Sequence, residues 1–115
     1  MISLEKPPCE RLGLNPDPPL RGSILGFAKS TLGQDPINGV RHPSEGSTSG
    51  WYVWCGAWSE ADDFFEPICI EHVKEYLPPV NAYLDLPTGY RFLIDGSGYE
   101  DIWFDESLLR VAEDR

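Results

Sequence analysis

Cysteine, histidine and carboxylate side chains are the groups in this chain that could perform chemistry. Cys69 and His72 lie three positions apart, a spacing that would place a sulfur and an imidazole one turn apart on a helix. His42 and Cys55 could complete a zinc site with them. No Cys-x-x-Cys pair is present, although close ligand pairs normally mark structural zinc, and no glycine-rich oxyanion element adjoins Cys69. The sequence therefore predicts no metal, no cofactor and no cysteine nucleophile.

Paired carboxylates could instead serve as a general acid and base. The candidate pairs are Asp62 with Asp63 and Glu100 with Asp101. Neighbours on a strand point to opposite faces, so Glu100 and Asp101 are poorly placed to share a substrate. Residues 95–101 do not have the ligand spacing of an EF-hand. A solvated acidic face is the favoured interpretation, and we expect no enzymatic activity.

Tryptophan is concentrated beside these acids. Three of the four tryptophans lie between Trp51 and Trp58, in a stretch that leads directly into Asp62, Asp63 and two phenylalanines. Large apolar rings next to carboxylates are typical of protein interfaces, where aromatic anchors lie within a charged rim. For any single tryptophan, packing in the core is the more frequent role. The sequence leaves open whether Trp51 and Trp54 are core or interface residues.

The formal net charge of −10 is concentrated in one part of the chain. Residues 51–106 contain twelve acids, and their only bases are Lys74 and Arg91. A field of this sign repels nucleic acid and anionic lipid and attracts basic partners. The same charge also keeps a small protein soluble, and the composition alone does not separate these two roles.

The length of 115 residues suits one domain with a single two-layer core. The composition is globular, with 41% hydrophobic and 12% aromatic residues, and contains no apolar run long enough to cross a membrane. The three cysteines are widely spaced, which suits reduced thiols. The first residues lack the basic and apolar regions of a secretory signal. We therefore expect a cytoplasmic protein.

Proline, glycine and apolar periodicity predict the elements that must position these side chains. Residues 1–22 contain five prolines and are expected to form an extended arm, with the domain at 23–115. Strands are predicted at 22–30, 39–43, 51–55, 90–94 and 99–104. The first two are expected to form a wide hairpin, and Asp95-Gly96 predicts a hairpin between the last two.

Helical patterns are fewer. Residues 68–77 have apolar side chains at helical spacing and are expected to form the main helix. Ser59 and Asp62 resemble a capping box that opens a short helix ended by Pro67. Shorter helical segments are expected at 80–86 and 105–110. The predicted fold is therefore α+β, an antiparallel sheet of about five strands packed against one main helix, with a proline-rich N-terminal arm.

The order of these motifs resembles the bacterial immunity protein 33 family. The resemblance covers roughly Ile24 to Trp103, and its most specific parts are Ser49-Gly50-Trp51 and the run from Tyr83 to Gly89. It implies a protein that binds a cognate bacterial toxin and blocks it by stoichiometric association. We expect the partner to be basic and the chain to be a monomer or weak dimer. The residues expected to contact the partner are Trp54, Trp58, Glu60, Asp62, Asp63, Glu66, Glu100, Asp101 and Asp105.

Two other functions are compatible with the residues. One is a small enzyme or ligand-binding domain that uses a cleft between Trp51, Trp54 and the acidic segment. The other is a regulatory interaction module unrelated to toxins. An ordered ligand in the tryptophan cleft would favour the first, whereas a lethal neighbouring gene that becomes harmless on coexpression would favour the immunity function.

Overall fold

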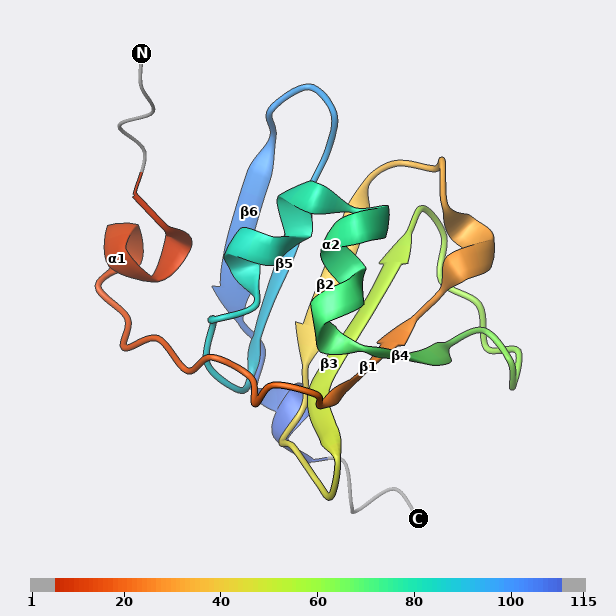
Figure 1. Ribbon diagram of the computed structural model, residues 1–115. Coiled ribbons are helices and arrows are strands. Elements are labelled where there is room, and N and C mark those ends of the chain that lie inside the picture. The colour runs from red at the N-terminus through yellow and green to blue at the C-terminus, as the bar shows by residue number, and fades with distance from the viewer. Residues whose placement is uncertain (1–5, 111–115) are drawn as a thin grey trace.

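The computed structural model describes residues 6–110, and within them the chain forms an α+β fold with a six-stranded mixed sheet and short helices (Figure 1). The strands are β1 (Ile24–Phe27), β2 (Ile37–Arg41), β3 (Thr48–Cys55), β4 (Glu66–Cys69), β5 (Tyr90–Ile94) and β6 (Glu100–Phe104). The α-helices are α1 (Pro8–Leu12) and α2 (Val73–Tyr76). The 3-10 segments are η1 (Lys29–Thr31), η2 (Ile70–His72), η3 (Pro78–Tyr83) and η4 (Glu106–Leu109).

The strand order of the sheet is β4-β1-β3-β2-β5-β6. β1 runs parallel to β3, whereas the other neighbouring pairs are antiparallel. The predicted hairpin of the first two strands is wrong, because β3 lies between β1 and β2. The predicted antiparallel sheet of about five strands is likewise corrected to a mixed sheet of six among the described residues.

The additional strand replaces the start of the predicted main helix. β4 pairs antiparallel with β1, so the backbone of residues 66–69 completes the hydrogen bonding of β1 instead of forming helical bonds. The helical residues that follow are divided into η2, α2 and η3, and Pro78 and Pro79 limit continuation. No described α-helix exceeds five residues, so the chain has several short helices in place of one main helix.

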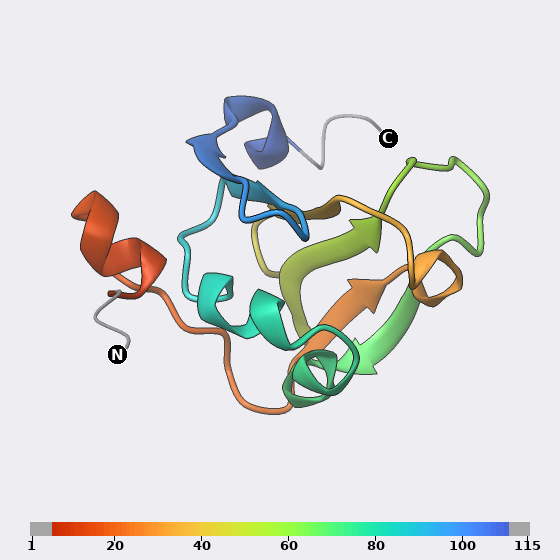
Figure 2. The ribbon, with the colours of Figure 1, turned by 90° about the horizontal axis from the view of Figure 1, so that it is seen from above.

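Each face of the sheet has its own apolar cluster. α2 and η3 cover the first face (Figure 2), where Trp51, Val53 and Phe92 are buried in the larger core. The loop after β3 and η4 lie on the second face, where Trp54 packs with Val40 and Leu108. Alternation along β3 therefore sends Trp51 and Trp54 to opposite faces, as the sequence predicts.

The N-terminal arm contains a helix that the sequence did not predict. Pro8 occupies the first turn of α1, where a missing amide costs nothing, and Gly13 ends the helix in the left-handed conformation. Beyond it, the Asp17 amide donates to the Asp85 carbonyl, and the thiol of buried Cys9 donates to the same oxygen. The arm is therefore attached to the segment before β5.

The C-terminal part confirms the local predictions. β5 and β6 form the expected hairpin, in which the Asp95 carboxylate accepts the amides of Ser97 and Tyr99. The closing segment is η4, capped by Asp105. None of the helices described here is both long and apolar enough to span a bilayer.

Candidate functional site

The second face of the sheet carries a continuous group of rings, here called the aromatic cluster: Tyr52, Trp54, Trp58, Phe64 and Phe65. The Trp54 and Trp58 rings meet edge to face at 5.0 Å between centroids, and the Phe64 and Phe65 rings do so at 4.9 Å. Such edge-to-face pairs are favourable beyond their buried area. Tyr52 and Trp54 come from β3, and the other three rings come from the loop between β3 and β4.

This loop, residues 56–65, does not form the predicted helix. The Ser59 hydroxyl accepts the Ala61 amide as a cap would, but the chain then makes a turn closed by the Phe64 amide on the Ala61 carbonyl. Phe64 is buried, Phe65 is half-buried, and both pack against the other rings of the aromatic cluster. Adjacent side chains on a helix diverge by about 100°, so burying both phenylalanines on one surface favours the irregular loop.

Six of the nine predicted partner residues gather at this loop and its flanking strands. Trp58 is 53% exposed, whereas Trp54 beneath it is only 6% exposed. The loop carboxylates are exposed, as is Glu66 at the start of β4. Trp58 is thus an exposed ring above a buried one, with acids on the same segment. The six residues are Trp54, Trp58, Glu60, Asp62, Asp63 and Glu66.

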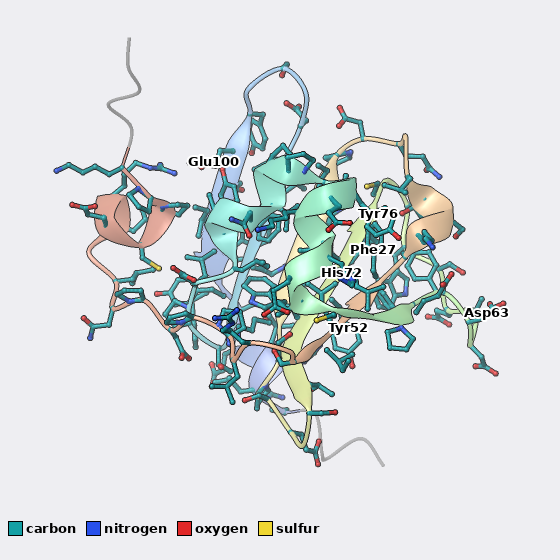
Figure 3. The ribbon with its side chains drawn as sticks, in the orientation of Figure 1. Phe27, Tyr52, Asp63, His72, Tyr76 and Glu100 are labelled. Carbon is teal, nitrogen blue, oxygen red and sulfur yellow. The ribbon has the colours of Figure 1, made fainter. Side chains whose placement is uncertain are left out.

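The other three predicted partner residues lie at the opposite edge of the sheet, on or just after β6. Figure 3 shows Glu100 on the opposite side of the molecule from Asp63 of the loop. Glu100 accepts two hydrogen bonds from Arg11, at 2.7 and 3.0 Å. Asp105 accepts from Arg91 at 2.8 Å, whereas Asp101 is exposed. The Arg11 hydrogen bonds lower the pKa of Glu100, and the Ser107 hydroxyl followed by Arg91 lowers that of Asp105. The nine residues therefore do not form one surface.

A groove of about 520 Å³ runs along the second face beside the loop. Val40, Tyr52 and Phe65 contribute apolar lining. Glu45, from the segment between β2 and β3, and Glu60, from the loop, bring carboxylates to the same groove. Of these five lining residues, sequence reasoning selected only Glu60 as a partner residue. The available signal was the alternation of β3, which places Tyr52 on the same face as Trp54.

The predicted cleft between Trp51, Trp54 and the acidic segment is wrong. Trp51 is fully buried on the first face, and its indole N–H donates to the Leu84 carbonyl at 3.0 Å. Trp54 lies on the second face, so the sheet separates the two rings. The groove that does exist is lined by Trp58 and Tyr52 instead.

The cysteine and histidine candidates do not form a reactive group. Cys69 ends β4, and its thiol donates to the Glu71 carboxylate at 2.8 Å. This hydrogen bond raises the pKa of Cys69, the opposite of what an activated nucleophile needs. His72 is exposed in η2, and buried Cys55 has a pKa raised chiefly by burial. Within residues 6–110, no group of three or more potential metal ligands is assembled.

The motifs that carry the family resemblance meet inside the molecule. Gly50 and Trp51 belong to β3, and Trp51 donates to Leu84 within the run 83–89. The Gly89 amide donates to the Arg41 carbonyl, and the Arg41 guanidinium donates to the Leu86 carbonyl. These residues build the scaffold on the first face, away from the exposed tryptophan loop.

The family model described as the Imm33-like domain matches residues 4–105. The chain belongs to the Imm33-like family. No curated protein matches it, and no solved structure matches it. The resemblance seen in the sequence is thus confirmed, and the match extends over the N-terminal arm and all six described strands. The family name indicates a toxin immunity protein.

The motifs shared with the Imm33-like family and the exposed residues of the loop have different places in this structure. The motif residues from Ser49 to Trp51 and from Tyr83 to Gly89 explain how the scaffold closes. The exposed tryptophan and the loop carboxylates lie outside those motifs, whereas Gly50 of the first motif also lines the groove.

Proposed function

We propose that this Imm33-like chain neutralises a cognate bacterial toxin by stoichiometric binding, and that the loop at residues 56–65 contributes the central contacts. The family name supports the immunity role. Exposure of Trp58 on a packed aromatic cluster is the observation that supports this surface. Binding alone accounts for inhibition, so the proposal requires no catalytic group.

Trp58 has the properties of an interface anchor. Its ring contacts those of Trp54, Phe64 and Phe65, with centroids 5.0 to 5.8 Å apart, yet half of the residue remains open to a partner. A ring held this way loses little further freedom when it binds, which favours affinity. Tryptophan is also among the side chains most enriched at energetically dominant interface positions.

The charge around Trp58 supports a basic partner. Residues 51–73 contain no lysine or arginine, and Glu60, Asp62 and Asp63 are exposed on the loop. Carboxylates at the rim of an interface mainly accelerate association with a partner of opposite charge. Toxins that act on nucleic acid fit this description, because their active sites attract phosphate.

The β6 edge is the weaker candidate for toxin binding. Glu100 and Asp105 already form ion pairs with Arg11 and Arg91. A toxin cation there would compete with these pairs, whereas the loop carboxylates form no ion pair within the described residues that a toxin would have to displace. Asp101 remains exposed and could contribute at the periphery.

The proposal includes action in the cytoplasm as a monomer or weak dimer. Cys9, Cys55 and Cys69 are all free thiols in this structure, which supports a reducing compartment. The acidic surface supports the monomer, because copies of like charge repel one another.

Coexpression provides the test. A toxin gene beside this one should kill cells when expressed alone and be harmless when paired with the wild-type chain. Trp58→Ala should lose protection and lower affinity by at least about 2 kcal/mol, with a smaller loss of stability than a substitution in the core because half of its surface is already exposed. Trp54→Ala should instead destabilise the fold by about 3 to 5 kcal/mol, because its ring is buried.

Trp103→Ala is the matched control, since Trp103 is a 37% exposed tryptophan on β6. It should retain protection. Loss of protection by Trp103→Ala with full protection by Trp58→Ala would move the interface to the β6 edge. Absence of any protection by the wild-type chain against its neighbouring toxin would contradict the immunity function itself.

A further inference from the structure

The groove beside Tyr52 is lined by both apolar side chains and carboxylates, and this combination determines which kind of group it can bind. Its apolar surface comes from Val40, Tyr52, Phe65 and the ring of Trp58. Glu45 and Glu60 enter from two segments that lie fifteen residues apart in the sequence. Neither carboxylate forms a hydrogen bond or ion pair with another residue in the range 6–110. The groove thus has two available acceptor groups beside aromatic rings.

His42 also lines the groove, and two contacts hold its ring. Its Nδ1 lies 3.0 Å from the Leu108 carbonyl oxygen, and a carbonyl can only accept. Nδ1 therefore carries a proton and donates it to this oxygen. The His42 and Tyr52 rings also meet edge to face at 5.5 Å, which fixes the imidazole on the groove side of β2.

This lining favours a cation and disfavours an anion. No lysine or arginine is among the described residues that line the groove. Aromatic faces attract a cation through their quadrupole, and carboxylates bind it through charge-assisted hydrogen bonds. A guanidinium uses both interactions at once, because it is planar, stacks on rings and presents several donors in a fixed fork. An ammonium group is more strongly hydrated and stacks less well.

The geometry points to the groove as the receptor for an arginine side chain that projects from the bound toxin, a proposal that rests on the toxin-binding function above. The aliphatic part of the arginine would lie along Val40 and Phe65, and its guanidinium would lie between the Glu45 and Glu60 carboxylates. A second copy of this chain is a poor occupant, because its acidic loop would be repelled by the carboxylates of the groove.

A short peptide tests this assignment without the toxin. The full chain, labelled with nitrogen-15, is titrated with acetyl-Gly-Arg-Gly-amide and followed by amide and indole NMR signals. We expect the largest shifts at Trp58, Gly50 and Glu60, which line the groove. The citrulline peptide has the same shape without the charge and should bind at least about tenfold more weakly. The lysine peptide should also bind more weakly than the arginine peptide.

Variants localise the effect. Glu45→Gln and Glu60→Gln should each weaken binding of the arginine peptide by at least about threefold, and both side chains are exposed, so the fold should be retained. Glu75→Gln, an exposed glutamate on α2, is the control and should bind like wild type. Equal binding of the arginine and citrulline peptides, tighter binding of the lysine peptide, or shifts centred on β6 would overturn the proposal.

The outcomes also separate this inference from the proposed function. If Glu45→Gln and Glu60→Gln protect cells like wild type while Trp58→Ala does not, the toxin is bound but no arginine occupies the groove. If the arginine peptide binds as expected and the wild-type chain gives no protection, the groove chemistry stands and the immunity function fails.

Discussion

Arg41 holds three separate parts of the chain together with one buried guanidinium. It is 4% exposed and donates to backbone carbonyls from the arm, from β3 and from the segment before β5: Asp17, Ser49, Leu84 and Leu86. Burial lowers the pKa of Arg41, and the nearby Asp17 and Asp85 carboxylates raise it. Arginine remains charged under all ordinary conditions, so these bonds are charge-assisted, and the shortest are those from Nη1 to the Asp17 and Leu86 carbonyls at 2.6 and 2.8 Å.

Arg41→Met should therefore lower the free energy of unfolding by about 3 kcal/mol, because buried carbonyls lose their donors and no water replaces them fully. Urea denaturation followed by tryptophan fluorescence measures this loss. Lys74→Met removes an exposed cation from α2 and should change stability by less than about 0.5 kcal/mol. Wild-type stability of Arg41→Met would show that these bonds contribute little.

Sequence reasoning at the residue scale identified exposed groups better than buried ones. The acidic loop residues, expected to form a solvated face, are exposed, because charged side chains favour water. Of the two tryptophans predicted to contact the partner, Trp58 is exposed and Trp54 is buried. Arg41 was not selected, because a lone arginine in a strand gives no sign of carbonyls supplied by distant segments. For the same reason the groove residues His42 and Glu45 were missed, since only the folded sheet brings them beside Trp58.

At the scale of elements, Gly50 allows the backbone of β3 to lie close to the backbone at the end of β2. Its φ is +88°, a conformation that side chains other than glycine rarely adopt, and an added Cβ would overlap the carbonyl oxygen of His42. The unusual φ and the close contact both occur where the two strands are hydrogen-bonded, since the His42 amide donates to the Gly50 carbonyl. The backbone there cannot shift without breaking the pairing of β2 with β3.

Gly50→Ala should cost more than 2 kcal/mol, since the left-handed conformation alone costs about 1–2 kcal/mol and the overlap adds to it. Gly46→Ala is a close control, because Gly46 also has a positive φ, +61°, but open space where a Cβ would lie. Thermal unfolding should separate the two variants clearly. Equal losses for both would mean that the conformation, and not the contact with His42, sets the cost.

The attachment of the arm to β6 should depend on pH. Hydrogen bonds from Arg11 lower the pKa of Glu100, so its contribution to stability is complete above the ordinary glutamate pKa. That contribution is lost as the pH falls through the lowered pKa of the folded protein. The stability difference between wild type and Glu100→Gln should therefore be largest near neutral pH and shrink in acid.

Urea denaturation of both proteins at a series of pH values measures this difference. Glu75→Gln provides the baseline for an exposed glutamate. A constant difference between wild type and Glu100→Gln from neutral pH into acid would contradict the role of the ionised carboxylate.

Helices and strands could be predicted where neighbouring residues in the sequence determine them. The β5–β6 hairpin follows from Asp95 and the glycines beside it, and the Asp95 carboxylate makes the expected turn bonds. The parallel pairing of β1 with β3 has no local signal, because the partners are separated by all of β2. Residues 68 and 69 were predicted as the start of the helix at 68–77, but their pairing with β1 overrides that preference.

At the scale of the whole molecule, the asymmetry of charge should control how quickly a toxin is captured. The acidic loop projects from the sheet at the end where β3 leads towards β4 (Figure 2). Carboxylates placed there attract a basic protein over roughly a Debye length, about 8 to 10 Å at physiological salt. Contacts of the aromatic cluster then act over shorter distances and determine how long the complex lasts.

The double variant Asp62→Lys with Asp63→Lys should slow association with a basic toxin by at least about tenfold and weaken its salt dependence, with the fold unchanged. Stopped-flow fluorescence of Trp58 over a range of salt concentrations measures both effects. Asp101→Lys places one positive charge at the far edge and should have a smaller effect. Association that is insensitive to the double variant would exclude these residues from the interface.

The way residues 56–65 leave and rejoin the sheet has an evolutionary consequence. The segment departs after β3 and returns at β4, and the motifs that close the scaffold lie on other parts of the chain. Its length and chemistry can therefore diverge while strand pairing is conserved, provided that something apolar still covers Trp54. A lineage confronted by a new toxin could change its target by replacing this one segment, as antibodies diversify their hypervariable loops on a constant framework.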